Sequence, residues 1–222
     1  QFKLCCPVPL SSVLPLLFNL FIVSWIINTP FPVRWFLAQL ISRRRAPVAR
    51  EIYQQLGGAS PLLSETQAQA EAINSELGDG WRVFVAMRYW HPFSEETAKD
   101  VKKYDPDKIV LLPLYPQYSV TTSASSLSEW QRVASVIGLT KPTSIIGCYP
   151  TAAGLIGAHA GLLRDALASR ELGGKPLRVL FSAHGLPKKV IRSGDPYQWQ
   201  VEQTCLLYTS DAADERSSVD LG

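Results

Sequence analysis

One histidine of the sequence occupies a position from which it could transfer protons or bind a metal. His184 follows the apolar run 177–182 and precedes Gly185-Leu186-Pro187, so it ends a predicted strand at a forced turn. A neutral imidazole in such a place can accept a proton or bind a divalent transition metal. It can equally do no more than hydrogen-bond its own loop, and both interpretations remain open from position alone.

The other two histidines are better explained as structural residues. His91 also follows a predicted strand, but Pro92 and a helix start come directly after it. His159 lies in a predicted helix among leucines and alanines at helical spacing, which indicates a place near the core.

Arginines form a second group with chemical potential. Arg43, Arg44 and Arg45 are consecutive and adjoin the aromatic residues Trp35 and Phe36. Guanidinium groups bind carboxylates and phosphates, although an arginine run is also typical of a solvated helix end. Arginine beside aromatic surface favours a flat apolar ligand with acidic side groups over nucleic acid. Further candidate ligand contacts follow predicted strands, namely Arg88, Tyr89, Tyr115 and Tyr118, and Tyr53 lies within a predicted helix.

The elements that must position these residues alternate along the chain. The predicted strands are 82–87, 108–114, 144–148 and 177–182. The predicted helices are 36–45, 48–56 after Pro47, 64–77, 94–104, 125–137, 151–170 and one from about 196. Such alternation predicts an α/β fold with a mostly parallel sheet, whose ligands gather at the carboxyl ends of the strands. No glycine-rich phosphate loop follows any strand, which argues against a nucleotide ligand.

Composition and charge limit the class of protein. The chain has 222 residues, of which 46% are hydrophobic and 18% charged, so whole-chain disorder is excluded. A net charge of +3 is too small to indicate nucleic-acid binding. The cysteines, at 5, 6, 148 and 205, form no C-x-x-C pair and predict reduced thiols in a cytosolic protein.

The apolar stretch 13–27 is shorter than the ~20 residues that a membrane span needs. It also contains Pro15 and Asn19, and it lacks the features of a signal peptide. We therefore expect a buried helix or an apolar surface helix, and peripheral contact with a membrane stays open.

Four blocks of sequence resemble one known family in order and spacing. The segment Phe181-Ser182-Ala183-His184-Gly185-Leu186-Pro187 closely resembles the histidine motif of ferrochelatases, which insert Fe²⁺ into protoporphyrin IX to form protoheme. The other three blocks are Arg43–Leu62 with its Arg-Arg-Arg-Ala-Pro start, Met87–Pro92 and Leu112–Ser119. The resemblance runs from about residue 16 to residue 204.

The resemblance implies a fold, an activity and roles for particular residues. The family has two similar Rossmann-like halves with parallel sheets and the porphyrin between them, so we expect a first half at 1–136 and a partial second half at 137–204. His184 would be the catalytic histidine that binds iron or removes pyrrole protons. Arg45, Tyr53 and Ser60 would contact the porphyrin, and Arg88 and Tyr89 would lie beside the macrocycle. The enzyme would be a cytoplasmic lyase of heme biosynthesis with Fe²⁺ as substrate and no organic cofactor.

The sequence departs from the family at both ends. Residues 1–12 are atypical, and nothing after Thr204 matches the glutamate that works opposite the histidine. We expect 205–222 to be a foreign or disordered tail and the chain to be a poorly active fragment. A non-catalytic tetrapyrrole-binding protein, a cobalt or nickel chelatase and a partner-binding module are the alternatives. An iron–sulfur cluster and the oligomeric state stay undetermined.

Overall fold

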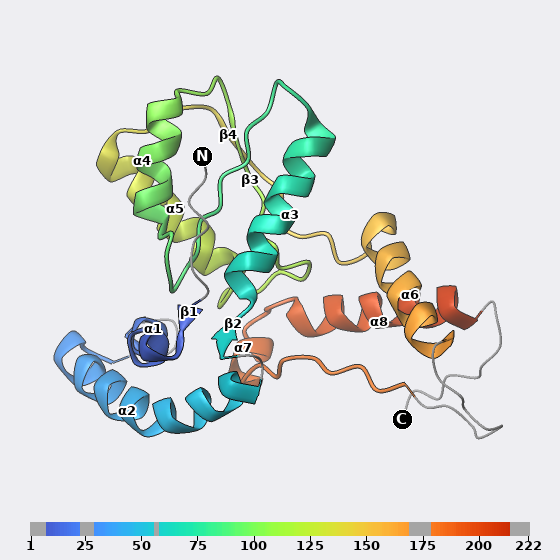
Figure 1. Cartoon of the computed structure of the whole chain (residues 1–222), viewed down its shortest axis with the longest axis horizontal. Coiled ribbons are helices and arrows are strands. Elements are labelled where there is room, and N and C mark those ends of the chain that lie inside the picture. The colour runs from blue at the N-terminus through green and yellow to red at the C-terminus, as the bar shows by residue number, and fades with distance from the viewer. Residues whose placement is uncertain (1–7, 23–28, 56–57, 169–178, 214–222) are drawn as a thin grey trace. The chain divides into compact units, whose positions relative to one another are not determined.

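The structure is a computed structural model that describes residues 8–22, 29–55, 58–168 and 179–213 (Figure 1). The chain divides into two compact units, and each is described by itself. The first unit comprises Gln1–Lys108 and Ser128–Pro142, and the second comprises Ile109–Leu127 and Thr143–Gly222. The domain boundaries expected at residues 136 and 204 remain predictions.

The first unit begins with short elements and two helices that pack together. β1 (Val8–Pro9) pairs antiparallel with β2 (Ala59–Ser60), and η1 (Leu10–Ser12) leads into α1 (Val13–Phe21). α2 (Phe31–Gln55) lies against α1 (Figure 1). Small side chains recur every fourth residue on the buried face of α2, namely Ala38, Ser42 and Ala46. This spacing puts them on one face of the helix and lets α1 approach closely.

α2 continues through Pro47, where the sequence predicted a break between two helices. A proline inside a helix removes one backbone hydrogen bond, and this cost is the reason a break is expected. Contacts on both sides of the proline favour the continuous helix. Ala46 is buried, and the Arg50 Nε donates a hydrogen bond to the Leu10 carbonyl oxygen at 3.2 Å.

The remaining helices of the first unit are α3 (Leu62–Leu77), α4 (Ser94–Tyr104) and most of α5 (Ser123–Ile137). α4 ends at the predicted residue, but Ser94, which was predicted to cap the helix, is its first residue, and Phe93 is the N-cap. Its first turn carries Glu95 and Glu96 and its last turn Lys102 and Lys103, as the helix dipole favours. The buried apolar residues of α4 and α5 are Ala98, Val101, Trp130 and Val133.

The predicted strand at 82–87 is wrong, because this segment has no regular structure apart from an isolated bridge between Met87 and Phe93. Its backbone bonds to side chains of the neighbouring helices instead of to a strand. The Val83 N–H donates to Asn74 Oδ1 at 3.1 Å, and Thr97 Oγ1 donates to the Val85 carbonyl at 2.7 Å. These side-chain hydrogen bonds satisfy backbone N–H and C=O groups that pairing with a neighbouring strand would otherwise satisfy.

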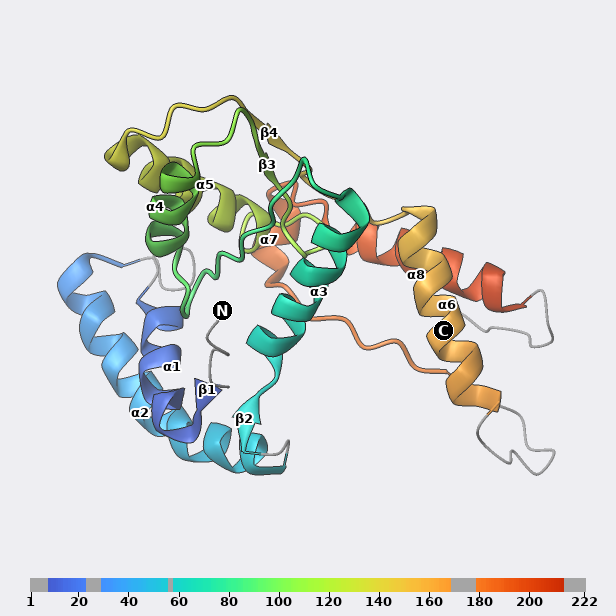
Figure 2. The same cartoon turned by 45° about the horizontal axis from the view of Figure 1, so that its top comes forward.

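The second unit contains the parallel strands β3 (Ile109–Leu111) and β4 (Thr143–Ile145), with Ile109 opposite Thr143. Its helices are α6 (Ala153–Ala168), α7 (Lys188–Arg192) and α8 (Tyr197–Ala213), and α6 packs against α8 (Figure 2). The structure is therefore mixed α/β, as predicted, but mostly helical with a two-stranded parallel sheet among the described residues.

The fourth predicted strand, 177–182, differs from the structure in the part that is described. Residues 177–178 lie outside the described residues, and 179–187 have no regular structure. Leu180 is 85% exposed, and Val179 and Phe181 are exposed as well. A strand of a parallel sheet is stabilised by pairing and by burial of both faces, and these apolar side chains have no such burial here.

α8 continues past Cys205 as far as Ala213, so residues 205–213 of the tail that was predicted to be foreign or disordered are helical. The origin of the segment 205–222 stays a prediction. Within the described part of the chain, no helix is long and apolar enough to cross a membrane.

Candidate functional site

The first unit contains all five residues that were predicted to bind the porphyrin. Arg45 is exposed on α2, with its guanidinium 5.9 Å from the centroid of the Phe21 ring, within the range of a cation–π contact. Tyr53 lies half-buried two turns further along α2. Ser60 is half-buried in β2, and its Oγ accepts a hydrogen bond from the Leu62 N–H at 3.3 Å.

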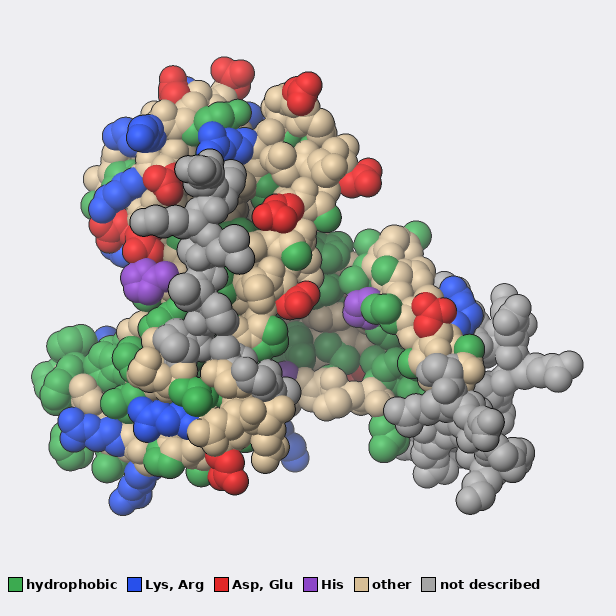
Figure 3. All heavy atoms as spheres, in the orientation of Figure 1, with side chains coloured by type: hydrophobic (Ala, Val, Ile, Leu, Met, Phe, Trp, Pro, Cys, Tyr) green, Lys and Arg blue, Asp and Glu red, His purple; other side chains and the backbone are tan. Residues whose placement is uncertain are grey.

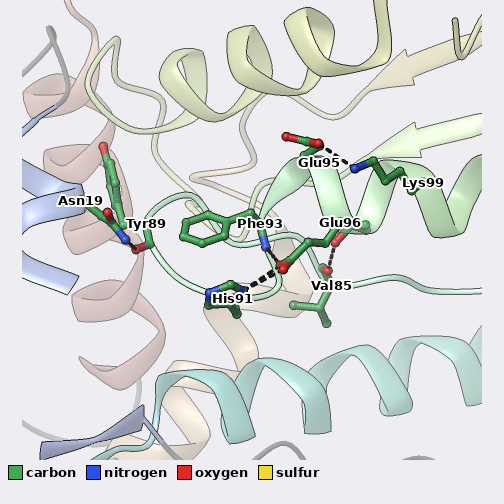
Figure 4. Close-up of polar contacts among 9 residues, drawn as sticks. Asn19, Val85, Tyr89, His91, Phe93, Glu95, Glu96 and Lys99 are labelled. Carbon is green, nitrogen blue, oxygen red and sulfur yellow. Dashed lines mark hydrogen bonds and ion pairs between the residues drawn. The ribbon is translucent and has the colours of Figure 1, made fainter. Parts of the chain in front are cut away.

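Arg88 and Tyr89 follow the irregular segment 82–87 and are both half-buried. The Arg88 guanidinium lies 5.2 Å from the centroid of the Tyr89 ring. The Asn19 Nδ2 of α1 donates a hydrogen bond to the Tyr89 carbonyl oxygen at 3.3 Å (Figure 4). These contacts fix both residues against the end of α1.

An open pocket of about 530 Å³ adjoins Arg88 in the first unit. The pocket is lined by Asn19, Ile22, Arg88, Phe93, Ser94, Glu95, Glu96, Lys99 and Glu129. Its carboxylates are held by neighbours: Glu95 pairs with Lys99 at 2.7 Å, and Glu129 with Arg132 at 2.8 Å. The hydrogen bond from Arg132 lowers the pKa of Glu129, and the positive charge of Arg88 lowers it further. Glu129 is thus kept ionised and contributes negative charge beside Arg88.

The end of α1 joins these two groups of predicted site residues. Phe21 lies under Arg45, Asn19 bonds to Tyr89, and Ile22 lines the pocket with Arg88. The sequence did not single out Asn19 as a site residue. The sequence nevertheless distinguishes Asn19, because it is a polar residue inside the apolar run 13–27.

His91 has the structural environment that the sequence predicted. Its Nδ1 lies 2.8 Å from Glu96 Oε1, and its ring makes an edge contact with Phe93 at 4.5 Å between centroids. Glu96 Oε2 also accepts the Phe93 N–H at 2.6 Å, so one carboxylate joins the histidine to the first turn of α4 (Figure 4).

His184 belongs to the second unit, where its side chain is exposed in the irregular segment just before α7. No group of three or more His, Cys, Asp or Glu side chains that could hold a metal occurs among the described residues. The expected place of His159 near the core is wrong, because it is exposed on α6 with Nδ1 2.5 Å from the Tyr208 hydroxyl.

The loops that follow β3 and β4 are bound to each other and to the start of α8. The Tyr149 N–H donates to the Pro116 carbonyl at 2.8 Å, and the Tyr149 hydroxyl donates to the Pro113 carbonyl at 3.1 Å. Burial raises the pKa of Tyr149, so this hydroxyl stays protonated as a donor. The Gln117 side chain donates a hydrogen bond to Thr204 Oγ1, and the Tyr118 N–H donates one to Gln200 Oε1. Thr204 and Gln200 both belong to α8.

The parallel pair β3–β4 and the helices that alternate with it define an α/β protein. A family model described as ferrochelatase matches residues 2–221, beyond the limits of 16 and 204 expected from the motifs. The chain belongs to the ferrochelatase family.

Curated relatives support this assignment. A ferrochelatase of Wolbachia sp. subsp. Brugia malayi is 45% identical, over 90% of this chain and 67% of the relative. One of Caulobacter vibrioides is 49% identical, over 91% of this chain and 59% of the relative. One of Pelagibacter ubique is 45% identical, over 91% of this chain and 59% of the relative. Two of these three relatives are therefore matched over less than two thirds of their own length.

Proposed function

We propose that this chain carries the porphyrin-binding face and the catalytic histidine of a ferrochelatase, which inserts Fe²⁺ into protoporphyrin IX to form protoheme. The observation that carries this proposal is the family match across nearly the whole chain. The placement of Arg45, Arg88 and Tyr89 around the end of α1 supports it.

The proposed roles follow from the chemistry of the side chains. Arg45 and Arg88 pair with the propionate groups of the porphyrin, because guanidinium binds carboxylates strongly. Tyr53 and Tyr89 contact the ring, and the Ser60 hydroxyl forms a polar contact. Metallation replaces two pyrrole protons with Fe²⁺. Either the His184 imidazole accepts one of these protons and water takes the other, or it holds the incoming Fe²⁺ while both protons pass to water.

Metal insertion by the full chain tests the proposal. Protoporphyrin binding is measured by quenching of tryptophan fluorescence, and insertion is measured anaerobically with Fe²⁺ as loss of porphyrin fluorescence. We expect slow insertion that His184→Ala abolishes while binding is retained. His159→Ala, which changes another exposed histidine of the second unit, is the matched control.

Two outcomes would overturn the proposal. Binding without insertion, unchanged by His184→Ala, would indicate a non-catalytic tetrapyrrole-binding protein. A preference for Co²⁺ or Ni²⁺ and for another tetrapyrrole would indicate a different chelatase.

We further propose that the protein is cytoplasmic and that the start of α2 contacts a membrane surface. Phe31 is 60% exposed, Trp35 46% and Phe36 62%. Figure 3 shows Lys or Arg side chains beside a hydrophobic patch at this end of α2. Exposed aromatic residues next to arginines are typical of helices that bind anionic lipid surfaces. Sedimentation with vesicles containing phosphatidylglycerol should be lost in Trp35→Ser/Phe36→Ser and kept in Val136→Ser, which changes a 75% exposed residue of α5. Equal sedimentation of both variants would contradict the contact.

A further inference from the structure

A buried carboxylate in the second unit lies at the junction between the His184 segment and α8. Asp195 is only 8% exposed and follows Gly194, whose φ of 93° turns the chain between α7 and α8. An ionised group at this depth is costly unless hydrogen bonds satisfy it.

Three donors satisfy the Asp195 carboxylate. Its Oδ2 accepts the Ser119 hydroxyl at 2.9 Å and the Val120 N–H at 2.8 Å. Its Oδ1 accepts the Tyr197 N–H at 3.0 Å in the first turn of α8. Ser119 is itself fully buried. Asp195 therefore binds the loop after β3 on one side and the start of α8 on the other.

The next turns of α8 extend this attachment to both strand-end loops. Gln200 Oε1 accepts the Tyr118 N–H at 2.6 Å, and Thr204 Oγ1 donates to the Pro150 carbonyl at 2.8 Å. Gln200 Nε2 also contacts Cys148 Sγ at 3.6 Å. The loops after β3 and β4 are thus fixed to α8.

The segment that carries His184 ends at Asp195, the residue that bonds the loop after β3 to the start of α8. It runs from 179 through α7 to Asp195, and within 179–187 it has no regular structure to hold it. Because Asp195 fixes the carboxyl end of this segment, it limits where His184 can lie relative to the ends of β3 and β4.

We infer that Asp195 is a positioning residue for His184. This inference rests on the proposed function of His184 and adds the group that holds its segment in place. Asp195→Asn replaces one of the two acceptor oxygens with an NH₂ group. That NH₂ group faces either the Val120 N–H or the Tyr197 N–H, which are both donors, so one of these two hydrogen bonds is lost.

Histidine NMR and kinetics of the full chain test the inference. The chain has 3 histidines, so each imidazole Cε1–H signal is assigned by single substitution. In Asp195→Asn we expect the His184 signal to shift or broaden while the His91 and His159 signals stay in place. The kcat of metal insertion should fall on the order of 10- to 100-fold, with the KM for porphyrin unchanged. Asp165→Asn, an exposed carboxylate on α6, is the matched control and should change neither.

A His184 signal unaffected in folded Asp195→Asn would overturn the inference, as would an equal shift in Asp165→Asn. Should Asp195→Asn fail to fold, Ser119→Ala removes one of the three donors and should shift the His184 signal in the same direction by less. No shift in Ser119→Ala would then overturn it. If the chain inserts no metal, the proposed function fails, while the NMR shift still tests the positioning separately.

Discussion

The Asn19 side chain of α1 donates a hydrogen bond to the Tyr89 carbonyl oxygen, 3.3 Å away, across 70 residues of sequence. This bond connects α1 to the loop that carries Arg88. Phe21, two residues further along α1, lies under the Arg45 guanidinium. One short helix thereby holds two groups of proposed porphyrin contacts in the first unit.

Asn19→Ala should weaken protoporphyrin binding several-fold, because the Tyr89 carbonyl loses its donor and the loop with Arg88 loosens. The free energy of unfolding should fall by about 1 kcal/mol. Titration of tryptophan fluorescence with protoporphyrin checks the affinity. Asn74→Ala is the control, since Asn74 also bonds a backbone group, the Val83 N–H. It should lose similar stability but bind porphyrin normally, and equal loss of binding in both variants would contradict the role of Asn19.

Thr97→Val should destabilise the first unit by roughly 1 kcal/mol, because the half-buried Val85 carbonyl loses its donor. Thr97 is only 4% exposed, so the isosteric valine preserves packing and removes only the hydroxyl. Urea unfolding measures the change. Thr66→Val removes an exposed hydroxyl that bonds the Leu62 carbonyl and should cost less. A smaller effect at 97 than at 66 would show that the segment 82–87 is held in another way.

Glu96→Ala should destabilise α4 by about 1 kcal/mol, since the carboxylate accepts the Phe93 N–H at the start of the helix. The same change frees the His91 ring from its partner. Glu95→Ala removes an exposed pair with Lys99 and should lower the stability less than Glu96→Ala does. Thermal unfolding followed by circular dichroism compares the two variants, and the reverse order of their melting temperatures would refute the capping role.

Glu129 should make stability depend on pH in the acid range. Its pKa is lowered in the folded state, chiefly by the hydrogen bond from Arg132, from an ordinary value of 4.5. Its stabilising contribution is therefore complete above pH 4.5 and is lost as the pH falls through the lowered pKa. The effect should be about 0.5 kcal/mol, because the pair is partly exposed.

Urea unfolding at pH 7 and at acid pH checks this prediction. Glu129→Gln should flatten the acid decline relative to the unchanged chain. Glu71→Gln, an exposed residue on α3, should leave the decline as it is. An identical decline in all three proteins would assign the pH dependence to other groups.

The sequence by itself determined the family, the α/β class and those helices whose signals are local. α4 is the clearest case, because glutamates in its first turn and lysines in its last turn fix both ends within eleven residues. The four motif blocks likewise needed no structure, since their order and spacing are properties of the chain.

Tertiary structure alone decided the features that depend on distant partners. α2 continues through Pro47 because Ala46 and Arg50 make contacts outside the helix, and 82–87 is not a strand because Asn74 and Thr97 bond its backbone. Asn19 and Asp195 bond to groups 70 and 76 residues away. Periodicity and capping describe interactions within a few residues, so they cannot show which distant group a buried amide or carboxylate will meet.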